Sequence, residues 1–313
     1  MPSTRREFLA LTAAARLAAA KGMQYHIGIT SNTRGGWEND VFLSFREARE
    51  VGYRWVESFI QYFWRDYLLR GAPGADDLQK KVEALGLRFV TISNSGPMEM
   101  HFEDPAKHEK IIEEHLRLVR FIKLLGCDHL KINTGARHPE GTSAEDLKQI
   151  ASVLNAIGRR TSAEGLKFAF HAHMWSQLEN RREIDFVLSH TNPRDVWFVL
   201  DTGQITMAGM DPVALARTLG SRVIEYHLKD VKPENRGGAK HRVAHHEPMT
   251  HPLFFPLGEG GVDFPALMGY LNDTSWRGWL TVELDSSPFQ PPKESARISR
   301  DYLEKKLHLD LTV

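Results

Sequence analysis

The sequence predicts an α/β protein built as a single (β/α)8 barrel, and three features of the chain support this fold class. Short apolar segments alternate with amphipathic ones after residue 22, a glycine precedes most of the apolar segments, and eight such segments fit within residues 23–313. Eight strands separated by helices suit a closed barrel of parallel strands better than an open doubly wound sheet. The predicted strands are 26–30, 54–59, 88–93, 129–133, 167–173, 197–201, 223–229 and 279–285.

The segments between these strands carry the period of helices. Residues 107–126 place one apolar stripe at i, i+3, i+4 spacing, made of Ile111, His115, Leu118, Ile122 and Leu125. Residues 142–165 open with Thr142 and Glu145 in the spacing of a capping box. Asp211 followed by Pro212 is typical of an N-cap and the first residue of a helix. We therefore expect helices to begin at these points.

Glycines mark the expected ends of the helices. A left-handed residue there lets the chain turn back into the next strand, and the candidates are Gly52, Gly86, Gly126, Gly165, Gly220 and Gly278. The recurring helix–glycine–strand unit implies right-handed crossovers and a parallel sheet. No Gly-x-Gly-x-x-Gly follows a predicted strand, and no Gly-rich loop ends in Lys-Ser or Lys-Thr. These absences exclude dinucleotide-binding and P-loop sites.

Composition limits the classes of partner. Lys+Arg and Asp+Glu number 40 each, and the pI is about 7.3, so no excess charge favours nucleic acid or anionic membranes. The single cysteine, Cys127, excludes an internal disulfide framework and a cysteine-based zinc cluster. We therefore expect a protein that acts on a small molecule, with no nucleic-acid partner and no membrane insertion. Barrels of this kind often pair, so a homo-oligomer is compatible with the prediction.

Residues 1–22 differ from the barrel segment that follows them. Paired Arg5 and Arg6 precede a mildly apolar Ala/Leu segment, which resembles a twin-arginine export signal. The segment is too short, and at Arg16 too charged, to span a membrane as a stable helix. We expect export to the periplasm, or a disordered N-terminus. The alternative is a start at Met23, directly before the first strand, which predicts a cytoplasmic protein.

Four consecutive strands finish on side chains that bind metals. His171, Asp201, His227 and Glu283 lie at the ends of the predicted fifth to eighth strands, and barrels place their chemistry at those ends. A lone Asp there is more often a cap, and a lone His is usually a hydrogen-bonded core residue, but four at matching depth predict one divalent ion. Two carboxylates with imidazole ligands favour Mn²⁺, Co²⁺ or Zn²⁺ over Mg²⁺.

The same region resembles the xylose-isomerase-like barrels, which include sugar-phosphate isomerases and epimerases, and most closely the inosose dehydratase branch. The segments that carry the resemblance are "FAFHAHM", "VLDTGQITMAGMDPVALA", "RVIEYHLKDV" and the stretch that runs from "FPLGEGG" to "LTVELDSSP". They cover most of residues 166–288, and "REVGYRWVESF" extends a weaker likeness to the second strand. The order of Leu-Asp-Thr-Gly, His-x-Lys-Asp and Pro-Leu-Gly-Glu-Gly is fairly specific to the superfamily.

The resemblance implies which residues hold the ion. Asp201, His227 and Glu283 match the family's ligands, whereas the epimerases carry a carboxylate at the position of His171. The dehydratase-like members have a His-x-His pair there, as in His171 and His173, and either imidazole is a candidate for the fourth ligand. The family commonly has His where this chain has Gln204, which removes a ligand that the multi-zinc endonucleases of the superfamily need.

The expected mechanism is removal of the proton next to a carbonyl, through an enediolate that the ion stabilises. Glu283 is the candidate base, and His173 and Lys229 are candidates to donate protons or to stabilise negative charge. Further candidates for substrate contact are Trp37, Glu57, Lys131, Gln204 and Arg242. For Glu57 a structural ion pair, for Trp37 a plug at the barrel rim, and for Arg242 a solvated loop or oligomer contact are the alternatives. Arg242 belongs to a long connection, 233–261, in which a substrate lid is the functional alternative.

These roles predict a metal-dependent isomerase or epimerase of sugars or sugar phosphates. Because two-base epimerisation needs a carboxylate on each face of the substrate and His171 replaces one, a dehydratase acting on a keto-cyclitol or keto-sugar is an alternative, as is a one-base isomerase. An alternative from another class is a non-catalytic sugar-binding barrel whose site has decayed, since His171 and Gln204 both depart from the epimerase pattern.

Overall fold

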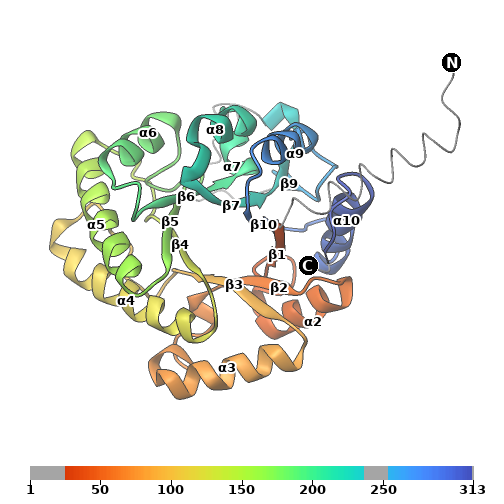
Figure 1. Cartoon of the computed structure of the whole chain (residues 1–313), viewed down its shortest axis with the longest axis horizontal. Coiled ribbons are helices and arrows are strands. Elements are labelled where there is room, and N and C mark those ends of the chain that lie inside the picture. The colour runs from red at the N-terminus through yellow and green to blue at the C-terminus, as the bar shows by residue number, and fades with distance from the viewer. Residues whose placement is uncertain (1–24, 236–252, 312–313) are drawn as a thin grey trace, which may run out of the picture.

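The computed structural model describes residues 25–235 and 253–311, and its centre is a barrel of eight parallel strands (Figure 1). The strands follow the order β3-β2-β1-β10-β7-β6-β5-β4, which confirms the predicted (β/α)8 fold. Their bounds are β1 Tyr25–Thr30, β2 Trp55–Phe59, β3 Arg88–Ser93, β4 His129–Asn133, β5 Lys167–His171, β6 Trp197–Asp201, β7 Val223–Leu228 and β10 Gly278–Val282. A short antiparallel pair, β8 Asp230–Val231 and β9 Phe254–Phe255, follows β7.

Seven of the eight seams between neighbouring strands are backbone ladders within the described residues. Side chains bridge the eighth seam, between β3 and β4. The Thr91 hydroxyl donates to the His129 carbonyl over 2.8 Å. The Asn94 amide pairs with both backbone groups of Asn133, over 2.8 and 2.9 Å. The barrel is therefore nearly closed, and the seam beside the end of β4 is held by an asparagine.

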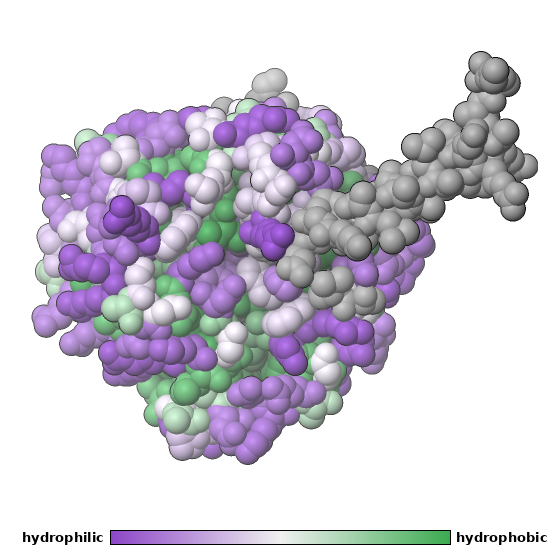
Figure 2. Space-filling model, in the orientation of Figure 1, coloured by the Kyte–Doolittle hydropathy of each residue, from purple (hydrophilic) through white to green (hydrophobic). Residues whose placement is uncertain are grey.

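Helices form a ring around the strands (Figure 1). They are α2 Val41–Val51, α3 Ala72–Ala84, α4 His108–Leu124, α5 Ala144–Ala163, α6 Arg181–His190, α7 Thr202–Met207, α8 Pro212–Leu219, α9 Phe264–Asp273 and α10 Pro292–Lys305. Short 3-10 turns lie at η1 Trp37–Asn39, η2 Ile60–Tyr62, η3 Leu68–Arg70, η4 Pro105–Lys107, η5 Gly220–Arg222 and η6 Pro233–Asn235. The predicted stripe of α4 and the residue after it is buried against the sheet, and Figure 2 shows hydrophilic side chains over much of the viewed face. None of the helices in the described part of the chain has the length and apolar character needed to cross a bilayer.

Two of the predicted helix boundaries need correction. The capping box of α5 is formed by Ser143 and Asp146, one residue later than expected, because the Thr142 hydroxyl donates instead to the Gln177 carbonyl over 2.6 Å. Gly278 has no left-handed backbone: it is the first residue of β10, and Ser275 takes the positive φ of 52° after α9. Gly278 is instead needed for close approach, since a Cβ there would lie 2.6 Å from the Ile224 carbonyl oxygen.

The other predictions for the ends of helices hold, whereas three strands end early. Asp211 caps α8 and Pro212 is its first residue, and five of the six glycines have positive φ angles between 52° and 112°. The strands β5, β7 and β10 end earlier than predicted, at His171, Leu228 and Val282, so His173, Lys229 and Glu283 lie just beyond the strands. Residues 1–22 and Arg242 lie outside the described residues.

Candidate metal centre at the carboxyl ends of the strands

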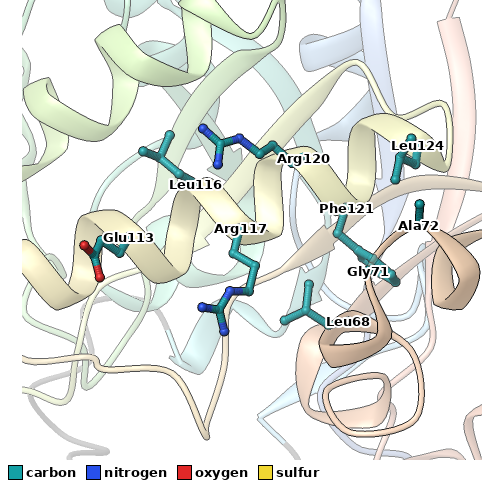
Figure 3. Close-up of a pocket in the computed structure, with 9 residues that line it drawn as sticks. All are labelled: Leu68, Gly71, Ala72, Glu113, Leu116, Arg117, Arg120, Phe121 and Leu124. Carbon is teal, nitrogen blue, oxygen red and sulfur yellow. The ribbon is translucent and has the colours of Figure 1, made fainter.

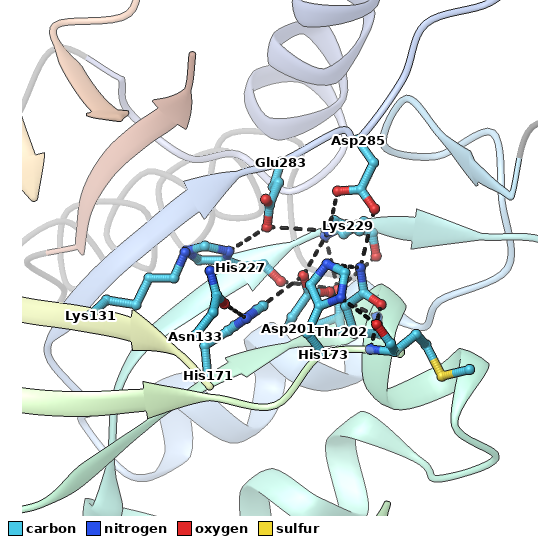
Figure 4. A network of polar contacts seen from close by, with 12 residues as sticks. Lys131, Asn133, His171, His173, Asp201, Thr202, His227, Lys229, Glu283 and Asp285 are labelled. Carbon is cyan, nitrogen blue, oxygen red and sulfur yellow. Dashed lines mark hydrogen bonds and ion pairs between the residues drawn. The ribbon is translucent and has the colours of Figure 1, made fainter. Parts of the chain in front are cut away.

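The four predicted ligands converge on one point inside the mouth of the barrel. One ligand atom from each of His171, Asp201, His227 and Glu283 lies within 4.8 Å of the others, and all four side chains are buried. They come from the ends of β5, β6, β7 and β10 (Figure 4). Parallel strands with matched register present their last residues at equal depth, so side chains far apart in the sequence meet.

Asp201 uses its two carboxylate oxygens for different tasks. Oδ1 accepts a hydrogen bond from the Gln204 backbone N–H over 2.9 Å and so caps α7. Oδ2 lies 3.4 Å from His171 Nε2 and 3.0 Å from Lys229 Nζ. Neither Asp201 Oδ2 nor His171 Nε2 has a hydrogen-bond partner, although both are buried. Lys229 offsets the charge on Asp201 Oδ2, but His171 Nε2 is a buried ligand atom without a partner that faces this carboxylate. A bound cation would satisfy it, so these residues fit a metal ion.

The orientation of His171 is set by β4. The amide oxygen of Asn133 lies 2.8 Å from His171 Nδ1 and accepts its proton. Burial lowers the pKa of His171 well below its usual value, and the positive charge of Lys131 adds to this effect. The imidazole is therefore neutral, with its free lone pair at Nε2 directed to Asp201. A neutral imidazole held by a carbonyl-type oxygen is the usual form of a histidine ligand.

His227 lies between two carboxylates. Its Nδ1 is 2.5 Å from Glu283 Oε2, and its Nε2 is 2.9 Å from Glu57 Oε2. Burial lowers the pKa of His227, but the negative charges of Glu57 and Glu283 outweigh burial and raise the pKa to about 10. A proton therefore competes with a cation for Nδ1, and cation binding at this atom would release it.

Lys229 is a buried cation shared by three carboxylates (Figure 4). Its Nζ lies 2.8 Å from Asp285 Oδ1, 3.0 Å from Asp201 Oδ2 and 3.2 Å from Glu283 Oε2. Burial lowers the pKa of Lys229, yet the three negative charges raise it above the usual value. The ammonium thus stays charged. Asp285 was not among the predicted site residues, although its spacing from Glu283 gives both residues the same strand parity.

His173 lies beside the four ligands and is bound to other partners. Its Nδ1 lies 2.7 Å from the Met174 carbonyl oxygen and donates to it, and its Nε2 accepts from the Gln204 amide over 2.9 Å. The same Gln204 amide donates to Asp285 Oδ2 over 3.2 Å. Because both ring nitrogens of His173 are engaged, the geometry favours His171 as the fourth ligand. Gln204 connects His173 to the Lys229 network.

Glu57 and Lys131 lie inside the barrel as an ion pair, with Lys131 Nζ 2.9 Å from Glu57 Oε1. Glu57, Glu225 and His227 form a second group with metal-ligand spacing, but protein cations already satisfy its carboxylates. His129 Nε2 lies 2.9 Å from Glu225 Oε2. The protein's own charges therefore neutralise this deeper group without an added ion.

Trp37 and a pocket on the outer wall are not part of the group of four candidate ligands. Trp37 is 1% exposed, packs in the main core, and donates its indole N–H to Glu47 over 2.6 Å. Its role in substrate binding remains a prediction. A pocket of about 520 Å³ on the outer wall holds none of the predicted site residues (Figure 3). It is lined by Leu68, Gly71, Ala72, Glu113, Leu116, Arg117, Arg120, Phe121 and Leu124.

Comparisons with known proteins agree with this architecture. The family model described as "Xylose isomerase-like TIM barrel" matches residues 45–306. An inosose dehydratase from Clostridium botulinum is 29% identical over 164 residues, which cover 52% of this chain and 55% of that protein. The rhizopine catabolism protein MocC of Rhizobium meliloti is 31% identical over 163 residues, covering 51% of this chain and 50% of that protein. The chain thus spans about half the length of the curated relatives it matches.

A solved structure shows the likeness of the fold. D-psicose 3-epimerase from Clostridium cellulolyticum, solved with D-tagatose, superposes with a TM-score of 0.70 at 15% identity, covering 90% of this chain and 98% of that chain.

Proposed function

The chain belongs to the xylose isomerase-like TIM barrel family, and from this membership and its site we propose a metal-dependent enzyme that removes the proton next to the carbonyl of a keto-sugar or keto-cyclitol. The observation that carries the proposal is the buried group of His171, Asp201, His227 and Glu283, in which His171 Nε2 has no hydrogen-bond partner and faces Asp201 Oδ2 over 3.4 Å. Among its relatives are proteins named inosose dehydratase, which suits a cyclitol ketone as substrate.

The four residues would hold a divalent ion through two imidazoles and two carboxylates, a set that favours Mn²⁺, Co²⁺ or Zn²⁺. When bound there, such an ion supplies Lewis acidity toward a carbonyl oxygen. The protein's own contribution is to keep the ligands in register on rigid strands and to exclude water. The burial of all four side chains supports both the fixed positions of the ligands and the exclusion of water.

Glu283 is the side chain best placed to accept the proton. Its exposed fraction is 5%, against 0–1% for the other three ligands, so it is the one that reaches toward the open mouth. Burial raises the pKa of Glu283, but Lys229 and His227 hold the pKa well below its usual range. The carboxylate is therefore ionised. A general base must be ionised and within reach of the proton it removes.

A single base favours elimination as the outcome. The position that would bring a second carboxylate is occupied by His171, and both oxygens of Asp285 are held, one by Lys229 and the other by Gln204. Proton removal by Glu283 followed by loss of the β-hydroxyl breaks one C–H and one C–O bond, forms a C=C bond and releases water. We therefore propose a dehydratase. The same single base would also serve an isomerase that returns the proton to the neighbouring carbon.

The test separates proton removal from elimination. Protein loaded with Mn²⁺, Co²⁺ or Zn²⁺ is incubated with 2-keto-myo-inositol in D₂O; NMR reports deuterium next to the carbonyl, and ultraviolet absorption reports an enone. We expect both signals from the wild type and neither from Glu283→Gln. Deuterium uptake without an enone would favour the isomerase. Metal-loaded protein that exchanges no proton of keto-cyclitols or 3-keto-glycosides contradicts the proposal.

Metal content tests the non-catalytic alternative. A decayed sugar-binding barrel would hold no stoichiometric transition metal after incubation and desalting, whereas the proposed enzyme should retain about one ion per chain by elemental analysis.

A further inference from the structure

We propose that Glu57, held in place by Lys131, is a positioning residue that orients His227 for cation binding. The inference rests on the proposed function, because it supposes that a divalent cation binds at His227. Glu57 belongs to β2, on the opposite part of the barrel wall from the ligand-bearing strands β5 and β6.

The two oxygens of Glu57 have separate partners. Oε2 lies 2.9 Å from His227 Nε2, while Oε1 accepts from Lys131 Nζ over 2.9 Å and from the Ser93 hydroxyl over 3.3 Å. Glu57 is 0% exposed and Lys131 1% exposed, so water does not compete for these bonds. With both oxygens engaged, the carboxylate cannot rotate without breaking a buried charged bond, which is costly.

This arrangement fixes which nitrogen of His227 faces the candidate centre. Nε2 gives its hydrogen to Glu57, so Nδ1 is left on the side of Glu283, which it approaches to 2.5 Å. A carboxylate that accepts the other N–H of a ligand histidine sets its tautomer and ring orientation and makes it a better donor to the metal. Lys131 in turn neutralises Glu57, and its Nζ also lies over the Phe59 ring, 5.0 Å from the centroid.

Glu225, on the same strand β7 as His227, offers a matched control. It is also 0% exposed, and its nearest oxygen is 3.8 Å from His227 Nε2, too far for a hydrogen bond. Its own partners are His129, over 2.9 Å, and the Thr281 hydroxyl. Glu57→Gln and Glu225→Gln thus remove the same charge at the same burial, but only the first alters a hydrogen bond to His227.

The experiment measures Co²⁺ affinity and the visible ligand-field spectrum of the full chain, after removal of metals with a chelator. Circular dichroism and the melting temperature report the folded fraction of each variant. We expect Glu57→Gln to weaken Co²⁺ binding by about 10- to 100-fold and to change the spectrum, because the ring is no longer held by a charged acceptor. Glu225→Gln should retain the wild-type affinity and spectrum. Lys131→Met, which frees Glu57, should weaken binding in the same direction and takes the place of Glu57→Gln if that variant does not fold.

The outcomes distinguish this inference from the proposed function. If the wild type binds Co²⁺ and Glu57→Gln binds it equally well with the same spectrum, the positioning role is wrong and the metal site stands. If both Gln variants lose affinity equally, the effect is one of buried charge in general, and the inference is again wrong. If the wild type takes up no Co²⁺, the proposed function fails and this inference fails with it.

Discussion

At the scale of single residues, Asp201 joins a structural and a chemical task in one side chain. Oδ1 caps α7 through the Gln204 N–H, and Oδ2 faces His171 Nε2. From sequence, an aspartate at the end of a strand can be a helix cap or a metal ligand. One carboxylate can serve as both here, because each task uses a different oxygen. Substitutions that keep one oxygen can separate them.

Asp201→Asn should keep the cap and lose the charge. We expect metal retention to fall sharply in Asp201→Asn, since an amide is a poor ligand for a transition metal, with little change in the helix cap. Asp201→Ala should lose metal as well. Its free energy of unfolding should be about 1 kcal/mol lower than that of Asp201→Asn, because the cap is lost too. Elemental analysis and urea unfolding of the metal-free proteins measure the two effects. Full metal occupancy in Asp201→Asn would remove Asp201 from the ligand set.

The choice between the two histidines of "HAH" has a direct test. His171→Ala should lose stoichiometric metal, because His171 Nε2 is a buried atom without a hydrogen-bond partner that faces Asp201. His173→Ala should keep the metal, because its ring nitrogens serve Met174 and Gln204. Metal content after desalting decides between them. Loss in His173→Ala alone would reverse the assignment.

The sequence predicted the four ligand candidates because strand ends in a parallel barrel share one depth. It did not predict Asn133 as the partner of His171, because that contact follows from the register in which Asn133 of β4 lies opposite His171 of β5, and a single sequence does not show register. Asp285 was not predicted, although it lies two residues after Glu283 and an extended chain places both side chains on the same face. The burial of Lys229 among three carboxylates depends on side-chain convergence that spacing alone does not reveal.

At the scale of elements, the Asp230 carboxylate connects two sequence motifs that are far apart in the chain, His-x-Lys-Asp and Pro-Leu-Gly-Glu-Gly. Asp230 accepts hydrogen bonds from the backbone N–H groups of Val231, Gly258, Gly260 and Val262, over 2.9 to 3.0 Å. It thereby ties the "PLGEGG" segment to β8, the short strand that follows β7. A Cβ on Gly260 would lie 2.3 Å from Asp230 Oδ1, so this approach requires glycine.

Asp230→Ala should release that segment. Four backbone donors lose their acceptor, and each buried donor left without a partner costs about 1–3 kcal/mol unless water reaches it. We expect a lower melting temperature and faster hydrogen exchange in residues 256–262. Glu259→Gln, at an exposed position of the same segment, should change neither. Unaltered exchange in Asp230→Ala would show that the segment is held by other contacts.

Helix ends were predictable where a local signal was unique and less so where two residues competed. Asp211-Pro212 offers one N-cap, and it is used. Thr142 and Ser143 are adjacent candidates, and the tertiary contact of Thr142 with Gln177 decided between them. Likewise Gly278 was read as a C-cap, but α9 ends at Asp273 and the chain turns at Ser275, before the glycine.

At the scale of the whole molecule, the barrel interior contains buried charged side chains. His129, Lys131, Glu57 and Glu225 are all buried and paired with one another or with neighbours. Such pairs cost desolvation and stabilise the fold only while both partners keep their charge. The free energy of unfolding should therefore depend on pH through these groups.

His129 offers the clearest case, since it lies outside the ligand set. Burial lowers its pKa, but hydrogen bonds to Asp128 and Glu225 outweigh burial and raise the pKa from 6.5 to about 10. The folded protein therefore binds this proton more tightly than the unfolded chain. The stabilisation is fully present below pH 6.5 and is lost as the pH rises through about 10. Its size at pH 7 is on the order of a few kcal/mol.

We expect His129→Gln, which keeps a donor for Glu225 without the charge, to cost most stability near pH 7 and progressively less toward pH 10. Urea unfolding of metal-free protein between pH 6.5 and 10 measures this difference. His190→Gln, at an exposed position on α6, is the control and should give only a small difference in the free energy of unfolding. If the cost of His129→Gln were the same at every pH, the buried imidazole would not carry the charge that its two carboxylates favour, and the barrel interior would be neutral at this layer.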